Sequence, residues 1–299
     1  MALKDVKSRI ASVKNIQKIT RAMEMVAAAR LRRAEQRIEA LRPYASAIRR
    51  MTRQAAEAAG NVPNLPILNE HESVSNVGLL LVTGDRGLAG AFNSQIVRAG
   101  VRVAAEHEGE GRSMVWYASG RRGVSSLTFR GREVAGSYTG FTDRPAYGDA
   151  RDIAQDLMTA YVDGEVDQVE IVYNGYISPL TQEVTRETLL PLQQATILEA
   201  EDEDGDEEDH PSHTALVEYE PDPEAILQRL VPACVEISIY RALLESTASE
   251  HGARMTAMRN ASENASDLVK DLTLQMNRER QAEITQEIME VVAGAESLT

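Results

Sequence analysis

The sequence predicts an α+β protein with a long antiparallel coiled coil of N- and C-terminal helices and a small α/β (Rossmann-like) middle domain. Residues 1–58 and 222–299 contain few helix-breaking residues, and their apolar side chains recur in steps of three and four. Residues 59–221 instead alternate short apolar runs with helical stretches. Helices at opposite ends of one chain can pair antiparallel if the middle domain reverses the direction of the chain.

The N-terminal segment, from Leu3 to about Ala58, is predicted to bury one narrow apolar stripe. The stripe consists of Leu3, Val6, Ile10, Val13, Ile16, Ile19, Met23, Val26, Leu31, Ala34, Ile38, Leu41, Ala45 and Ile48. Its register slips at Ile16 and again before Leu31, so the heptad repeat is imperfect. We expect Pro43 to kink the helix, or to mark where the coil gives way to packing on the middle domain.

The middle segment alternates strand and helix patterns, which favours a largely parallel sheet. The predicted elements are strands at 77–82, 113–118 and 169–173, helices at 91–106 and 150–162, and turns at 83–90 and 120–123. Residues 199–209 hold nine acidic side chains in eleven positions and are expected to form a solvated loop. A calcium site there is less favoured, because the spacing does not fit an EF-hand loop.

The C-terminal segment is predicted to be helical from about Pro223 to Val292. Asp222 is a suitable N-cap, and Pro223 fits the first turn. Pro232 is expected to bend this helix or to delay its regular start.

Charge is unevenly distributed along the chain, whose net charge is −14. Residues 1–58 carry 14 Lys and Arg against 5 Asp and Glu, whereas residues 222–299 carry 7 basic and 13 acidic residues. A basic helix on an acidic protein indicates an acidic partner surface or nucleic acid.

The sequence lacks the patterns of secretion and of membrane insertion. The N-terminus has no apolar signal core, and no stretch approaches 18 uncharged apolar residues. We therefore expect the chain to meet a membrane only through partners. The single cysteine, Cys234, excludes an intramolecular disulfide and favours a reducing compartment.

No catalytic, cofactor-binding or metal-binding residue is predicted. The glycines of the 83–90 turn are Gly84, Gly87 and Gly90, a spacing that matches neither a dinucleotide fingerprint nor a P-loop, so a tight turn is favoured over a nucleotide site. The five histidines show no metal-ligand spacing. Cys234 lies between Ala and Val and is interpreted as a small core residue.

Two interpretations follow from these features. In the first, the helical pair is a mechanical or scaffold element enclosed by other subunits. In the second, the basic helix is an arm that binds RNA. The scarcity of aromatic residues and the overall acidity argue against RNA.

Several segments resemble a known family, the gamma subunit of the F-type ATP synthase. They are residues 10–28, 83–93, 219–222, 253–264 and 277–288, which follow the family's order and cover essentially the whole chain. The resemblance implies a central-stalk rotor shaft without catalytic residues that couples proton-driven rotation of the c-ring to conformational cycling of the catalytic beta subunits. The implied partners are the alpha and beta subunits of the catalytic head, the epsilon subunit and the c-ring, with no nucleic acid.

The resemblance also implies specific contact residues. Met23, Arg254, Arg280, Gln281 and Thr285 correspond to positions that face the alpha and beta ring. Tyr219 and Glu220 correspond to contacts with the c-ring and epsilon. The regulatory cysteine pair of the plant-chloroplast branch is absent, which favours a bacterial origin. The implied location is the cytoplasmic side of a bacterial plasma membrane, peripheral and held through partners.

Overall fold

The computed structural model describes residues 3–59, 65–192 and 223–296. These described residues divide into two compact units, one within residues 1–29 and 254–299 and the other within residues 30–253. Two long helices, α1 (Leu3–Ala59) and α6 (Pro223–Glu296), contribute to both units. The acidic run 199–209 and Asp222 lie outside the described residues.

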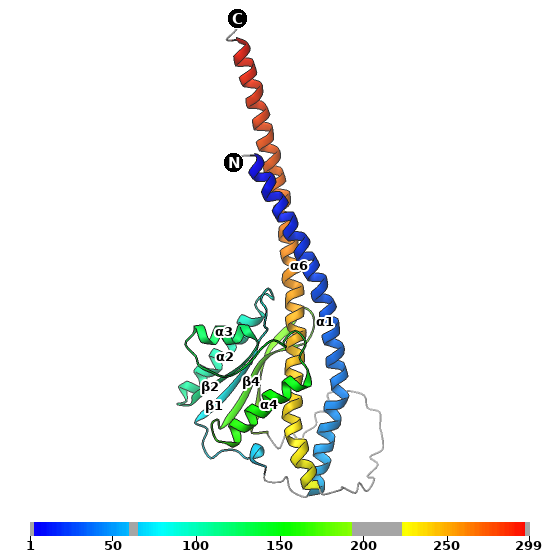
Figure 1. Ribbon diagram of the computed structural model, residues 1–299, viewed down its shortest axis with the longest axis vertical. Coiled ribbons are helices and arrows are strands. Elements are labelled where there is room, and N and C mark those ends of the chain that lie inside the picture. Colours follow the sequence, from blue (N-terminus) through cyan, green and yellow to red (C-terminus); the bar gives the residue numbers. More distant parts are fainter. Residues whose placement is uncertain (1–2, 60–64, 193–222, 297–299) are drawn as a thin grey trace. The chain divides into compact units, whose positions relative to one another are not determined.

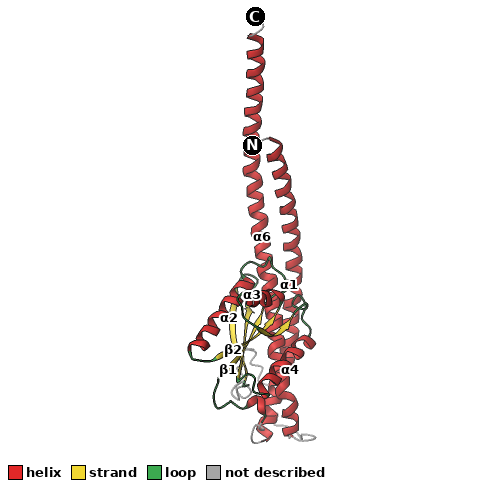
Figure 2. Ribbon diagram, turned by 60° about the vertical axis from the view of Figure 1, so that its left-hand side comes forward, coloured by secondary structure: helices red, strands yellow, loops and turns green. Residues whose placement is uncertain are grey.

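The first unit is an antiparallel pair of helical segments. The beginning of α1 lies beside the second half of α6, and α6 continues past the start of α1 (Figures 1 and 2). Within this unit Arg259 Nε lies 2.9 Å from Glu24 Oε1. The predicted antiparallel coiled coil is thus confirmed.

Both prolines are accommodated inside their helices. The α6 helix begins at Pro223 and continues through Pro232, so the predicted delay of its start was wrong. Val231 and Val235, on either side of Pro232, are fully buried, and this packing compensates for the backbone hydrogen bond that proline cannot donate. Packing of α1 on the α/β domain also begins before Pro43, because Arg30 pairs with Asp143.

The second unit contains a five-stranded sheet with the order β3-β2-β1-β4-β5. The strands are β1 (Asn76–Val82), β2 (Ser113–Ser119), β3 (Val134–Tyr138), β4 (Gln168–Tyr176) and β5 (Gln182–Leu190). Only β5 runs antiparallel to its neighbour, so the largely parallel sheet is confirmed. Sequence patterns missed β3 and β5, because edge strands contain polar residues in place of a continuous apolar run.

Helices cover both faces of the sheet (Figure 2). On one face α2 (Phe92–Gly109) and α3 (Arg121–Phe129) pack with Leu79 and Leu81 of β1. On the other, α4 (Tyr147–Val162), the short 3-10 helix η1 (Pro66–Leu68) and the first part of α6 pack with Leu80 and Val82. The expected turn at 120–123 is instead the start of α3, which begins directly after Gly120.

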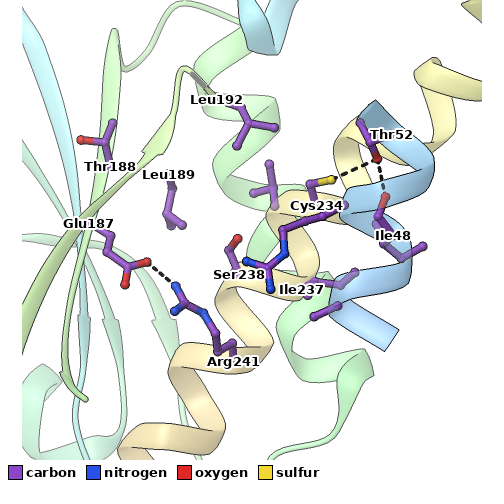
Figure 3. A pocket seen from close by; sticks show the side chains of 13 residues that line it. Ile48, Thr52, Glu187, Thr188, Leu189, Leu192, Cys234, Ile237, Ser238 and Arg241 are labelled. Carbon is purple, nitrogen blue, oxygen red and sulfur yellow. Dashed lines mark hydrogen bonds and ion pairs between the residues drawn. The ribbon is translucent and has the colours of Figure 1, made fainter. Parts of the chain in front are cut away.

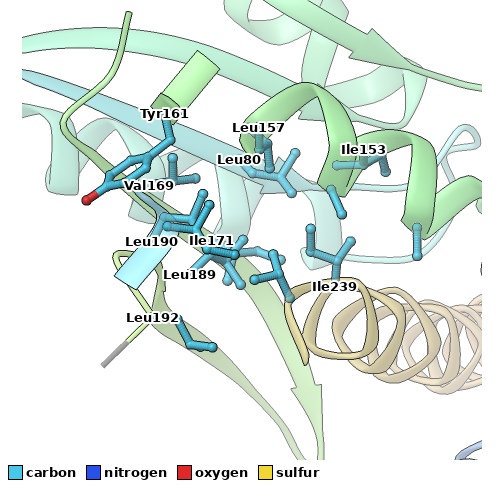
Figure 4. Packing of buried hydrophobic residues seen from close by; sticks show 14 of the residues in the cluster. Leu80, Ile153, Leu157, Tyr161, Val169, Ile171, Leu189, Leu190, Leu192 and Ile239 are labelled. Atoms are coloured by element: carbon cyan, nitrogen blue, oxygen red, sulfur yellow. The ribbon is translucent and has the colours of Figure 1, made fainter. Parts of the chain in front are cut away.

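The larger core lies between the sheet, α4 and α6 (Figure 4). Ile153 and Leu157 of α4, Ile171 of β4 and Ile239 of α6 are fully buried there. Burial of each aliphatic side chain contributes roughly 1.5–3 kcal/mol, so this core stabilises the packing of α6 against the α/β domain.

Candidate partner-binding surfaces

The seam between the paired helices differs from the predicted stripe. From Leu3 to Ala27 one series of buried and half-buried positions follows an unbroken alternation of three and four: Leu3, Val6, Ile10, Val13, Gln17, Thr20, Glu24 and Ala27. The predicted slip at Ile16 was wrong, because polar residues continue the heptad where the apolar residues leave it. The Thr20 hydroxyl satisfies its hydrogen-bonding need within the helix, donating to the carbonyl oxygens of Ile16 and Gln17 at 3.1 Å.

The apolar residues that leave the seam form a second stripe on the outside of α1. Ile16, Ile19 and Val26 are exposed and Met23 is half-buried, at spacings of three and four. Ile19, for example, is 59% exposed. A contiguous apolar stripe outside the core is typical of an interaction surface. We define Ile16, Ile19, Met23 and Val26 as the outer stripe.

Basic side chains lie on a different side of α1 from the outer stripe, because the helix turns by about 100° per residue. Lys14, Lys18 and Arg21 are exposed, and none of them has an ion pair with another described residue. This part of α1 therefore presents apolar area on one side and positive charge on another, which suits partner elements that contact both sides of the helix and include acidic side chains.

The C-terminal end of α6 is an unaccompanied helix. Every side chain from Arg280 to Ala293 is exposed. Ile284, Ile288 and Val291 lie at spacings of four and three, so they share one face, and Ile288 is 57% exposed. A helix of this length without tertiary packing is only marginally stable in water, so this segment is suited to a surrounding partner.

The residues implied by the family resemblance occupy different environments. Arg280 and Gln281 are exposed on this C-terminal end, as is Thr285, whose hydroxyl donates to the Gln281 carbonyl oxygen at 2.8 Å. Met23 belongs to the outer stripe. Arg254 is buried within the chain. Tyr219 and Glu220 lie outside the described residues.

The 83–90 turn exposes an apolar residue that the sequence interpretation missed. Leu88 has a φ of 63° and is 66% exposed. A leucine in the left-handed region is strained, and such strain is common at functional positions. The sequence does not predict that Leu88 adopts a left-handed backbone conformation and exposes its side chain. Only the structure shows both.

Arginines surround this turn. The side chains of Arg86 and Arg121 are exposed, and a Cβ added to Gly87 would come within 3.0 Å of the Arg122 guanidinium. Arg86 and Arg121 have only long ionic contacts, at 3.8 Å to Asp143 and 3.9 Å to Asp85. We define Arg86, Leu88, Arg121 and Arg122 as the basic turn.

A cavity of about 150 Å³ in the second unit lies between α1, β5 and α6 (Figure 3). Cys234 lines it, with its sulfur 3.6 Å from Thr52 Oγ1. Burial raises the pKa of the Cys234 thiol, so little of it is the reactive thiolate. Cys234 is half-buried, which agrees with its interpretation as a small core residue.

The described part of the chain has neither a cluster of metal ligands nor a membrane-spanning helix. Among those residues no group of three or more His, Cys, Asp or Glu is arranged to hold a metal ion. No described helix is long and apolar enough to cross a membrane.

The sequence of this chain is similar to those of known proteins along nearly its whole length. The family described as ATP synthase matches residues 2–298. ATP synthase gamma chains from Rubrobacter xylanophilus and Moorella thermoacetica are 44% and 42% identical to this chain, covering 99% of it and 98% and 99% of their own lengths.

The chain belongs to the ATP synthase gamma-chain family. Among solved structures it is similar to the central stalk and c-ring structure of the Tetrahymena thermophila mitochondrial ATP synthase, with 26% identity, a TM-score of 0.60, and coverage of 82% of this chain and 99% of that one. A rotational-state structure from Euglena gracilis shares the fold at 18% identity and a TM-score of 0.68, covering 99% of this chain and 94% of that one.

This membership confirms the predicted family and supports the rotor-shaft interpretation over an RNA-binding arm or a non-rotary scaffold. The gamma chain is thus a central-stalk subunit of the F-type ATP synthase.

Proposed function

We propose that this gamma chain transmits torque without catalysing a reaction itself. In this proposal proton-driven rotation of the c-ring turns gamma, and its rotation cycles the catalytic beta subunits through conformations of different nucleotide affinity. Binding that differs between conformations is what allows a rotating surface to drive such a cycle. The observation that carries the proposal is the helix from Arg280 to Ala293, which is exposed at every position and has an apolar face.

The alpha and beta subunits are the proposed partners of the C-terminal helix and of the outer stripe. Ile284, Ile288 and Val291 would be enclosed by apolar surface, while Arg280, Gln281 and Thr285 would hydrogen-bond to beta. Met23 would contribute from the outer stripe. Arg254 is proposed to act from its buried position, by holding α6 in the orientation that these contacts need.

The basic turn is proposed as a further contact with an acidic element of the catalytic head. Leu88 would supply apolar area, and the three arginines would supply charge complementarity. Such charges mainly accelerate association and select the partner. This contact should therefore weaken as the salt concentration rises.

The remaining partners are proposed from the family resemblance. Epsilon and the c-ring would bind through Tyr219 and Glu220. The complex would hold gamma on the cytoplasmic side of a bacterial plasma membrane, and the bacterial sources of the curated relatives support this location.

The test is reconstitution of the full chain with alpha and beta subunits. The triple variant Ile284→Ser, Ile288→Ser and Val291→Ser removes the exposed apolar face, and burial of each side chain is worth roughly 1.5–3 kcal/mol. We expect its affinity for the alpha and beta ring to fall by roughly 100-fold or more, since a tenfold change corresponds to about 1.4 kcal/mol.

A matched control carries Phe129→Ser and Val162→Ser, two exposed apolar residues on the α/β domain. The control should bind alpha and beta as the unaltered chain does. Equal affinity of the triple variant and the unaltered chain would contradict the proposed enclosure of the C-terminal helix.

A further inference from the structure

The carboxyl edge of the sheet is the place where other α/β proteins bind ligands. The chain proceeds from β1 to β2 and β3 on one side, then crosses to β4 on the other side of β1. Ligands of such folds bind outside the carboxyl ends of the strands, at the point where the strand order reverses. In this chain that point lies beyond Val82 of β1 and Tyr176 of β4.

A segment of α6 contacts the strand ends at this point. The hydroxyl of Ser249 donates to the carbonyl oxygens of Asn174 and Gly175, at 3.1 and 3.2 Å. The hydroxyl of Ser246 lies 3.5 Å from the Val82 carbonyl oxygen. Both serines are buried, so their hydroxyls bind the strand ends without competition from solvent.

Two internal carboxylates occupy the positions where an anionic ligand would be expected. A Cβ added to Gly84 would come within 2.8 Å of the Glu250 carboxylate, which therefore lies directly against the Gly84 backbone. The Asp85 carboxylate accepts a hydrogen bond at 3.1 Å from the backbone N–H of Arg121, the first residue of α3. Helix N-termini attract anions, and at the N-terminus of α3 the anion is the Asp85 carboxylate of the same chain.

One loop connects these carboxylates with both long helices. Thr142 donates from its hydroxyl to Asp85 at 3.0 Å, and its carbonyl oxygen accepts from the Thr247 hydroxyl of α6 at 2.9 Å. The next residue, Asp143, pairs with Arg30 of α1. Burial opposes the ionisation of Asp143, but the hydrogen bond and charge of Arg30, with the charges of His251 and Arg86, lower its pKa.

We propose that this arrangement is the joint through which torque passes between the α/β domain and α6. We define the socket as Gly84, Asp85, Thr142, Thr247, Ser249 and Glu250. Asp85 and Glu250 are its positioning residues, since they hold α6 and the turn and touch no substrate. This inference rests on the proposed rotor function.

Directional polar contacts suit such a joint. Apolar packing holds a helix against a sheet but resists rotation about the helix axis only through shape. Hydrogen bonds depend on distance and angle, so a rotation of α6 would break those of Ser249. It would also move Thr247 away from Thr142, although the Thr247 hydroxyl could still donate to the Leu243 carbonyl oxygen of its own helix. Buried groups left unpaired in this way are costly, which opposes slippage under load.

The test uses Gly84→Ala in the complete ATP synthase reconstituted in vesicles, with ATP hydrolysis and proton transport measured together. The added methyl group displaces the Glu250 carboxylate. Gly148→Ala is the matched control, since a Cβ at Gly148 meets nothing within 4 Å. We expect Gly84→Ala to assemble and hydrolyse ATP but to transport at least twofold fewer protons per ATP, with Gly148→Ala unchanged.

A compensating variant gives a readout that a general loss of stability would not produce. Glu250→Asp shortens the side chain by one methylene, so adding it to Gly84→Ala should restore the proton-to-ATP ratio. If Gly84→Ala fails to fold, Thr247→Val, which removes the hydroxyl bond to Thr142, takes its place with the same expected loss of coupling. An unaltered ratio in the folded variant would overturn the socket proposal. Failure of the unaltered chain to assemble with alpha and beta would instead overturn the rotor function and, with it, this inference.

Discussion

Glu24 of α1 and Arg259 of α6 form an ion pair of 2.9 Å across the helix pair, although 235 positions separate them in the chain. Glu24 occupies a seam position of the heptad, so the pair fixes the register in which the helices meet. A shift of either helix by one turn would separate the charges by about 5.4 Å.

The first prediction concerns this register. Glu24→Arg and Arg259→Glu should each destabilise the isolated chain, and the double exchange should restore most of the loss. The coupling energy should be roughly 0.2–1 kcal/mol, because Arg259 is half exposed and solvent screens the pair. Denaturant unfolding of the four chains measures it.

The exposed ion pair of Asp267 and Lys270, which lies within one helix, provides the control exchange. Its exchange should change stability by less than that of Glu24 and Arg259. A coupling energy of zero between Glu24 and Arg259 would contradict the proposed role in register.

The second prediction separates the seam from the outer stripe. Ile10→Ala should lower the free energy of unfolding by roughly 2–5 kcal/mol, because Ile10 is a buried seam residue. Ile19→Ala should change it by only about 0.5 kcal/mol or less, because Ile19 is exposed.

Binding to alpha and beta should show the opposite selectivity. Ile19→Ala should weaken association, whereas Ile10→Ala, measured at a temperature where it is folded, should not. Equal binding by Ile19→Ala and the unaltered chain would remove the outer stripe from the proposed interface.

The third prediction concerns Arg280 and Gln281. Their replacement by alanine should weaken the contact with beta by roughly 1.5–3 kcal/mol, as for hydrogen bonds to charged groups. ATP synthesis and hydrolysis by the assembled complex should fall, while far-UV circular dichroism and the melting temperature of isolated gamma stay unchanged, since both side chains are exposed.

A matched control replaces Arg102 and Gln95, which are exposed on α2. This double variant should keep full activity. Full activity of the Arg280 and Gln281 variant would exclude these residues from the torque-bearing contact, and its unfolding would show that they stabilise the chain itself.

The fourth prediction concerns acid stability. Burial opposes ionisation of Asp167, but hydrogen bonds from the backbone N–H groups of Asn76 and Ser75, and from His71, lower its pKa. A carboxyl group whose pKa is lower in the folded state stabilises the fold above its unfolded pKa of about 3.9. That contribution is lost as the pH falls through the folded pKa.

Asp167→Asn should therefore reduce stability at pH 7 and flatten the fall in the free energy of unfolding below about pH 4. Denaturant titrations from pH 7 down to pH 3 measure both effects. Asp152→Asn, at an exposed position on α4, is the control. An equally steep acid dependence in Asp167→Asn and the unaltered chain would show that other carboxyl groups dominate.

The amino-acid sequence by itself determined the type and order of the main elements. Helical periodicity at both ends predicted α1 and α6, because a repeat of three and four residues persists over many turns and outweighs single prolines. Continuous apolar runs predicted β1, β2 and β4, which are the inner strands of the sheet. The segments that resemble the gamma family predicted its identity from particular residues, including Arg280 and Gln281.

The tertiary structure decided which side chains are buried and which contacts cross the chain. Ile16 and Gln17 are neighbours, and only the position of α6 makes Gln17 part of the seam and leaves Ile16 exposed. The edge strands β3 and β5 are defined by pairing with a neighbour rather than by apolar runs of their own. Glu250 reads as an ordinary acidic residue of a long helix, and only the fold brings its carboxylate against Gly84. Local periodicity indicates which secondary structure a segment favours. These contacts instead join residues that are far apart in the sequence, and only packing of the whole chain brings them together.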